Sequence, residues 1–219
     1  MRYGIYGGAF DPLHWGHLLL AESCLQQSKL DRLIFVPTGV SPHRCGKDNF
    51  AASAEHRLAM LRLAVADYAE YLISDYEVKR QKKSYTVETL RYFTETLDTE
   101  TLNSEKPDKP ELFLLTGADM FYDLPNWYCA EEICTLAVPL AVRRPNCPMP
   151  NYSLLKPLVS EERYRKIMQQ NVMQDTIEMP LIGLSSSGIR KSVSEGKSIR
   201  FQVPDCVEKY IKENNLYRS

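Results

Sequence analysis

The start of the chain joins a short apolar strand to a helix through a turn that contains glycine, and this junction constrains the fold strongly. Residues 4–17 read GIYGGAFDPLHWGH. Backbone N–H groups at a helix N-terminus point outward and carry the positive end of the helix dipole, so an anion is favoured there. Glycine lets a ligand approach the backbone closely. The junction therefore predicts an α/β fold with a phosphate site at its first turn.

Two histidines strengthen this prediction. His14 and His17 are three residues apart at the expected helix start, so they lie on one face and can both offer ring N–H donors to one ligand. The chain has only four histidines, and His43 also stands beside a proline near an expected strand end, where α/β folds bind ligands. The alternative is an ordinary turn with histidines on the surface or in the core.

Composition bounds the class of protein. The chain has 219 residues, of which 44% are apolar, so we expect one α/β domain over 1–219 with a C-terminal helical segment from about 184 to 219. A formal net charge of −1 argues against a nucleic-acid coat. The basic run at 79–83 lacks interleaved aromatic residues and is expected to be a solvated loop.

The cysteines and the N-terminus indicate a cytoplasmic protein. The chain enters a strand at once, and no apolar run approaches the length needed to span a membrane. The six cysteines form no C-x-x-C pair and are expected to be reduced thiols. A zinc site at Cys129 and Cys134 would need two more ligands and ranks below simple burial.

Strand and helix patterns alternate along the chain. Strands are expected at the short apolar runs 32–36, 112–116 and 135–142, and helices at 54–65 and 87–97. The polar segment 98–110 and the proline-rich segment 144–150 are expected to be connections. This alternation predicts a doubly wound, Rossmann-like parallel sheet with helices on both faces and ligands beyond the carboxyl ends of its strands.

A second informative segment, residues 184–191, reads LSSSGIRK. A serine helix cap accounts for one serine. With the cap at Ser186 or Ser187, Arg190 falls within the first turn, where a cation opposes the helix dipole unless an anion is bound. Hydroxyls, backbone N–H groups and a guanidinium together suit a polyphosphate. Residues 196–198 follow a helix and lack the leading glycine of a P-loop, and no G-x-G-x-x-G pattern follows the first strand.

Together, residues 7–17 and 185–190 resemble the H-x-G-H and S-S-x-x-I-R signatures of the nucleotidyltransferase superfamily. Within it, the chain most resembles the bacterial nicotinate-nucleotide adenylyltransferases. Further segments fit that family in the same order, namely 36–44, 84–90, 117–127 and 203–211. Phosphopantetheine and cytidylyl transferases share the two ends but not the middle segments. Departures from the family pattern fall at Ala9, Ser41, Arg44 and Glu88.

The resemblance implies a Rossmann-like fold and adenylyl transfer from ATP to nicotinate mononucleotide, with Mg²⁺ held mainly by the ATP phosphates. It implies that the C-terminal segment completes the ATP site and leaves open whether Asp11 orders the turn or touches the metal shell. The expected catalytic residues are His14, His17 and Arg190. The expected ATP-binding residues are Gly8, Ala9, Phe10, His14, His17, Gly117, Asp119, Ser186, Ser187 and Arg190. The expected acceptor-binding residues are His43, Arg44, Tyr85, Thr86, Trp127 and Tyr128.

Alternative functions keep the same motifs. The acceptor could be nicotinamide mononucleotide or phosphopantetheine, and a nucleotide sensor without catalysis is a further alternative. From the sequence, Trp127 fits core packing almost as well as stacking on a pyridine ring. The expected partners are ATP and the mononucleotide, with neither nucleic acid nor membrane, and a homo-oligomer is left open.

Overall fold

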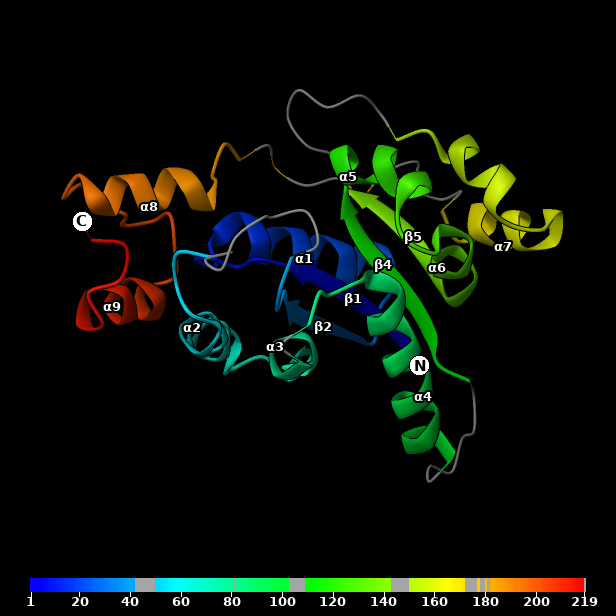
Figure 1. Ribbon diagram of the computed structural model, residues 1–219, viewed down its shortest axis with the longest axis horizontal. Coiled ribbons are helices and arrows are strands. Elements are labelled where there is room, and N and C mark those ends of the chain that lie inside the picture. Colours follow the sequence, from blue (N-terminus) through cyan, green and yellow to red (C-terminus); the bar gives the residue numbers. More distant parts are fainter. Residues whose placement is uncertain are drawn as a thin grey trace.

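The computed structural model describes residues 1–41, 50–80, 82–102, 109–142, 150–171, 177, 180 and 182–218. Within these ranges, five parallel strands form one sheet, and helices cover both of its faces (Figure 1). The predicted Rossmann-like α/β class is confirmed.

The sheet has the order β3-β2-β1-β4-β5. Its strands are β1 (Arg2–Gly8), β2 (Arg32–Pro37), β3 (Tyr71–Ile73), β4 (Glu111–Gly117) and β5 (Ala137–Val142). The chain builds outward from β1 to β3 and then returns to add β4 on the other side of β1. The crevice beyond the carboxyl ends of β1 and β4 is therefore the topological switch point, where open α/β sheets bind ligands.

Two helical layers sandwich the sheet. The helices are α1 (Trp15–Gln27), α2 (Ala54–Val65), α3 (Tyr76–Arg80), α4 (Thr86–Leu102), α5 (Ala118–Asp123), η1 (Leu124–Asn126), α6 (Ala130–Leu136), η2 (Tyr152–Leu158), α7 (Glu161–Asn171), α8 (Ser186–Ser194) and α9 (Asp205–Glu213). Helices α1 and α7 share a core cluster with one face of the sheet, and α4 packs with the other face.

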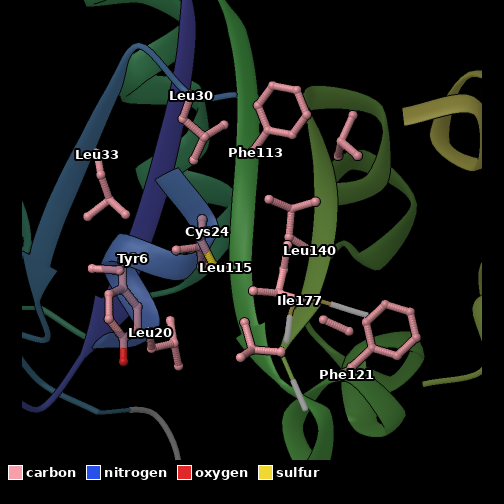
Figure 2. Packing of buried hydrophobic residues seen from close by; sticks show 14 of the residues in the cluster. Tyr6, Leu20, Cys24, Leu30, Leu33, Phe113, Leu115, Phe121, Leu140 and Ile177 are labelled. Atoms are coloured by element: carbon pink, nitrogen blue, oxygen red, sulfur yellow. The ribbon is translucent and has the colours of Figure 1, made fainter. Parts of the chain in front are cut away.

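Alternate residues of each strand supply the two cores, because successive side chains of a strand point to opposite faces. Tyr6 of β1 packs with the α1 layer, whereas Ile5 packs with the α4 layer. Figure 2 shows Leu20 and Cys24 of α1 lying among the strand residues of the first core. Strands buried on both faces read as continuous apolar runs, which is why β1, β2, β4 and β5 were visible in the sequence, whereas the three-residue, partly exposed β3 was not predicted.

A third core cluster attaches the C-terminal helices to α2. Met60 of α2 packs with Ile189 of α8 and with Val207 and Ile211 of α9, all nearly fully buried. In Figure 1, α8 and α9 lie together at the α2 end of the molecule, away from α4 and α7. This packing fixes the position of the N-terminus of α8 relative to the sheet.

Three boundary predictions were wrong. Residues 98–102 continue α4, since no glycine or proline occurs between Leu97 and Pro107. Thr135 belongs to α6 and not to a strand, and its hydroxyl donates to the carbonyl of Glu131 one turn earlier. The basic run 79–83 begins inside α3. Residues 103–108 and 143–149 lie outside the described residues.

The described part of the chain contains no helix long and apolar enough to cross a membrane. Cys24, Cys129, Cys134 and Cys206 are free thiols, while Cys45 and Cys147 lie outside the described residues.

Candidate active site

The β1–α1 turn, residues 9–14, follows the carboxyl end of β1 and is held by a buried aspartate. The Asp11 carboxylate accepts hydrogen bonds from the N–H of Ala51 at 2.7 Å, the N–H of Ala52 at 3.0 Å and the hydroxyl of Tyr217 at 2.7 Å. Burial, and next the Asp11 charge, raise the pKa of Tyr217. Because both carboxylate oxygens are engaged in these bonds, we conclude that Asp11 orders the turn.

His14 and His17 lie side by side at the start of α1, as predicted. Their rings are stacked with centroids 3.8 Å apart and planes 22° apart. The Nδ1 atom of His17 accepts from the backbone N–H of His14 at 3.3 Å, which assigns the ring proton of neutral His17 to Nε2. A Cβ at Gly16 would lie 3.0 Å from the His14 ring, so this position favours glycine. Nε2 of His17 is therefore set up as a hydrogen-bond donor.

The second predicted segment meets the β1–α1 turn. The Ser186 hydroxyl donates to the carbonyl of Pro12 at 3.0 Å, and Nη1 of Arg190 donates to the carbonyl of Asp11 at 2.6 Å. Two motifs that are far apart in the sequence thus share one site. Ser187 is exposed, and its hydroxyl contacts that of Ser185.

The helix-cap prediction for this segment, Ser186 or Ser187, was wrong by one or two residues. The cap of α8 is Ser185, whose side chain accepts from the N–H of Gly188 at 3.1 Å. Arg190 is consequently the fifth helical residue, just beyond the first turn, and its contact with a protein carbonyl explains part of its presence. The position of Arg190 in the helix therefore gives less support to a bound anion than the sequence indicated.

A cavity of about 770 Å³, called the side cavity below, opens next to the turn. It brings together Gly8 and Ala9 with four residues predicted for the acceptor: Tyr85, Thr86, Trp127 and Tyr128. Trp127 also packs against the α4-side core, so it combines both interpretations weighed from the sequence. The ring centroids of Tyr85 and Tyr128 are 4.9 Å apart.

Two further predicted residues stand at the neighbouring strand. Gly117 ends β4 and caps α5, and Asp119 follows in the first turn of α5 with an exposed side chain. They lie across the switch point from the β1–α1 turn, outside the lining of the side cavity. His43 and Arg44 lie outside the described residues.

Sequence reasoning missed two buried charged residues. Glu77 lines the side cavity, and its carboxylate accepts from the Thr89 hydroxyl at 2.6 Å. Burial raises the pKa of Glu77, although the hydrogen bond from Thr89 and the nearby Ser84 hydroxyl and Gly39 backbone oppose the shift. Arg57 is 1% exposed. The available signal was a cation on the apolar face of the 54–65 helix.

The described residues include no group of three or more histidine, cysteine, aspartate or glutamate side chains suited to a metal ion. Cys134 is fully buried in the core, as the simple-burial interpretation predicts, and burial raises the pKa of its thiol to about 11.

Comparisons with known proteins agree with this geometry. A family model described as cytidylyltransferase-like matches residues 5–192. A probable nicotinate-nucleotide adenylyltransferase of Rhodopirellula baltica is 38% identical over 218 residues, covering 98% of this chain and 92% of the relative. One of Thermomicrobium roseum is 36% identical, covering 100% of this chain and 92% of the relative.

Solved structures with low sequence identity share the fold. Plasmodium falciparum nicotinic acid mononucleotide adenylyltransferase complexed with NaAD has a TM-score of 0.68 and 18% identity, with 99% of this chain and 97% of that chain covered. A putative nicotinate-nucleotide adenylyltransferase from Vibrio parahaemolyticus has a TM-score of 0.65 and 19% identity, covering 100% and 96%.

Proposed function

Since this chain belongs to the cytidylyltransferase-like family and, within it, to the nicotinate-nucleotide adenylyltransferases, we propose that it transfers the adenylyl group of ATP to nicotinate mononucleotide. The products are nicotinate adenine dinucleotide and pyrophosphate, which makes the reaction a step of NAD biosynthesis. The observation that carries the proposal is the meeting of the β1–α1 turn with the start of α8 beside the side cavity.

The chemistry suits the donors that this site offers. The acceptor phosphate is already an anion, because the second pKa of a phosphate monoester is near ~6, so its attack on the α-phosphorus needs no general base. The bond to the pyrophosphate oxygen breaks as the new phosphorus–oxygen bond forms. Catalysis then depends on alignment of two polyanions and on neutralisation of the charge that accumulates on the leaving oxygens.

Each donor has a role in this scheme. His14 and His17 hold the α- and β-phosphate oxygens, and His17 stabilises the transition state through its Nε2–H. Arg190, with Ser186 and Ser187, holds the β- and γ-phosphates through the guanidinium N–H groups that do not bond to the Asp11 carbonyl. Backbone N–H groups of residues 8–10 hold the reacting phosphates.

The remaining predicted residues bind the two nucleosides. Asp119, with Gly117, accepts from the ribose hydroxyls of ATP. Trp127 stacks on the pyridine ring, and backbone N–H groups near Thr86 and Tyr128 receive its carboxylate. The mononucleotide phosphate is held by His43 and Arg44. The lining of the side cavity by Tyr85, Thr86, Trp127 and Tyr128 supports the acceptor assignment.

Mg²⁺ enters in this proposal as part of the substrate, Mg–ATP, in which it neutralises phosphate charge. The histidine, hydroxyl and guanidinium donors of the site fit a cation that the triphosphate carries, because Mg²⁺ usually keeps several waters and few protein ligands. The free thiols at the four described cysteines support a reducing compartment, the cytoplasm. We propose that residues 1–219 act as one domain whose segment 184–219 completes the ATP site.

The test is pyrophosphate release by the purified protein with Mg–ATP and either nicotinate mononucleotide or nicotinamide mononucleotide. We expect a strong preference for the acid. Equal use of both acceptors would overturn the acid specificity. If neither mononucleotide is used, phosphopantetheine is offered as a third acceptor, and pyrophosphate release with it alone would assign a different acceptor. Binding of Mg–ATP without turnover of any acceptor would favour a nucleotide sensor.

A further inference from the structure

Arg57 of α2 is a nearly fully buried cation behind the β1–α1 turn. Its side chain is 1% exposed, and its guanidinium carbon lies 4.0 Å from the centre of the Phe50 ring. Nη1 donates to the carbonyl of Ala9 at 2.9 Å, and Nη2 donates to the carbonyl of Thr38 at 2.9 Å. One planar fork therefore joins the turn after β1 to the turn after β2.

These two carbonyls belong to neighbouring parts of the proposed site, and both residues line the side cavity. Ala9 lies in the turn assigned to the ATP phosphates, and Thr38 lies in the wall of the side cavity assigned to the acceptor. The N–H of Thr38 also donates to the carbonyl of Gly8 at 2.9 Å. The fork and this bond together fix the separation between the two turns.

The orientation of the Ala9–Phe10 peptide follows from the same contact. In a trans peptide the carbonyl and the following N–H point in opposite directions. Because Arg57 holds the Ala9 carbonyl behind the turn, the N–H of Phe10 is directed away from Arg57. This is one of the backbone donors that the proposed function assigns to the reacting phosphates.

The Thr38–Gly39 peptide is confined on two sides. Arg57 binds the Thr38 carbonyl, and the backbone of Glu77 approaches Gly39 closely. A Cβ at Gly39 would lie 2.1 Å from the backbone oxygen of Glu77, so glycine is required for this approach. The wall of the side cavity therefore has little freedom to move relative to the β1–α1 turn.

We propose that Arg57 is a positioning residue that aligns the acceptor phosphate with the α-phosphorus of ATP by holding the Ala9 and Thr38 carbonyls on one guanidinium. This inference rests on the proposed function. A shift of about 1 Å in a reacting group can lower a rate by roughly 10²-fold, so loss of the fork lowers kcat more than it weakens binding.

The experiment compares Arg57→Lys and Arg57→Met with Leu61→Ala, which removes a fully buried side chain from the same helix. Kinetics with both substrates are measured well below the melting temperature of each variant. We expect both Arg57 variants to lose about 10- to 100-fold in kcat with KM for each substrate within about threefold of wild type. Lysine keeps the cation but not the fork, so we expect Arg57→Lys to recover melting temperature relative to Arg57→Met without recovering kcat.

Leu61→Ala is expected to lose stability and to keep wild-type kcat. A kcat for Arg57→Lys within threefold of that control would overturn the positioning role, as would a loss confined to KM. If Arg57→Met does not fold, the kcat of Arg57→Lys compared with that of Leu61→Ala still tests the positioning role. A wild-type protein that releases no pyrophosphate with either mononucleotide would overturn the proposed function itself. A wild type and Arg57 variants with similar kcat would overturn the positioning role alone.

Discussion

The β1–α1 turn and the side cavity are neighbouring parts of one site, yet they are built in different ways. The turn is fixed by hydrogen bonds to its own backbone or to Asp11 from Arg57, Ser186, Arg190 and Tyr217. The side cavity is lined largely by side chains from several segments, and its aromatic residues also pack against the core. The turn is therefore a preorganised array of donors, whereas the cavity is a shaped surface.

This difference divides the expected roles of the two regions. Charge changes at the phosphates during the reaction, so contacts at the turn strengthen in the transition state and act on kcat. The pyridine ring does not change, so its contacts in the cavity act equally on the bound substrate and the transition state. Such uniform binding appears in KM.

The largest effect is expected for His17→Ala. Removal of one donor to a developing charge typically costs about 10²- to 10³-fold in kcat, and we expect a loss in this range with KM for both substrates within about threefold. Steady-state pyrophosphate release measures both constants. His56→Ala is the matched control, because His56 contacts the Tyr210 hydroxyl on α9 and not the β1–α1 turn. A rise in KM with unchanged kcat would mean that His17 contributes only to substrate binding, as the cavity residues do, and would contradict the division of roles between the two regions.

A smaller effect is expected for Trp127→Ala. Stacking of an aromatic side chain on a base contributes about 1–3 kcal/mol, so KM for nicotinate mononucleotide should rise by roughly 5- to 150-fold while KM for ATP stays nearly constant. Trp127→Phe should recover much of the loss. Tyr92→Ala is the control for packing, since Tyr92 contacts the same core cluster but does not line the cavity. An equal rise for Tyr92→Ala would make the contribution of Trp127 one of packing alone.

The residues of the donor side were indicated by local physical patterns, whereas those of the cavity were expected only from the family resemblance. Residues 9–17 and 186–190 form local patterns in which glycine, serine and histidine spacing has a physical meaning at a helix start. The helix at 54–65 was also predicted with its observed bounds, because its apolar residues recur at helical spacing. Such features depend on residues that are near one another in the chain.

Tyr85, Thr86, Trp127 and Tyr128 were expected from the resemblance and line the cavity, but local patterns could not predict the cavity itself, since its lining depends on the order of the strands. Thr38 follows β2, Glu77 lies in α3 and Asn126 lies in η1, and no local spacing pattern indicates that these three residues meet. Arg57 was hidden because its helix was identified from the apolar residues around it, and only the tertiary structure supplies the two carbonyls that it binds. The end of α4 was also missed, because residues 98–102 are mostly polar and were assigned to a loop although they contain neither glycine nor proline.

The smallest effect is expected for Glu77→Gln, and it concerns stability as a function of pH. Burial raises the pKa of Glu77 above its ordinary value near 4.5, and the hydrogen bond from Thr89, the nearby Ser84 hydroxyl and Gly39 backbone, and the charge of Arg80 oppose this shift only in part. The folded state therefore binds the proton more tightly than the unfolded chain does. This contribution to stability is fully present below the unfolded pKa and is lost as the pH rises through the folded pKa.

Glutamine does not ionise, so the stability of Glu77→Gln relative to wild type should increase as the pH rises from about 4 to about 7. Denaturant unfolding of both proteins at several pH values measures this difference. Glu88, whose pKa is lowered chiefly by its hydrogen bond with Arg80, titrates in the opposite sense but is present in both proteins, so its contribution cancels. A difference that does not vary with pH would mean that Glu77 ionises alike in both states. The side cavity would then stabilise the Glu77 carboxylate as well as water does, and its description as a shaped surface that disfavours charge would be wrong.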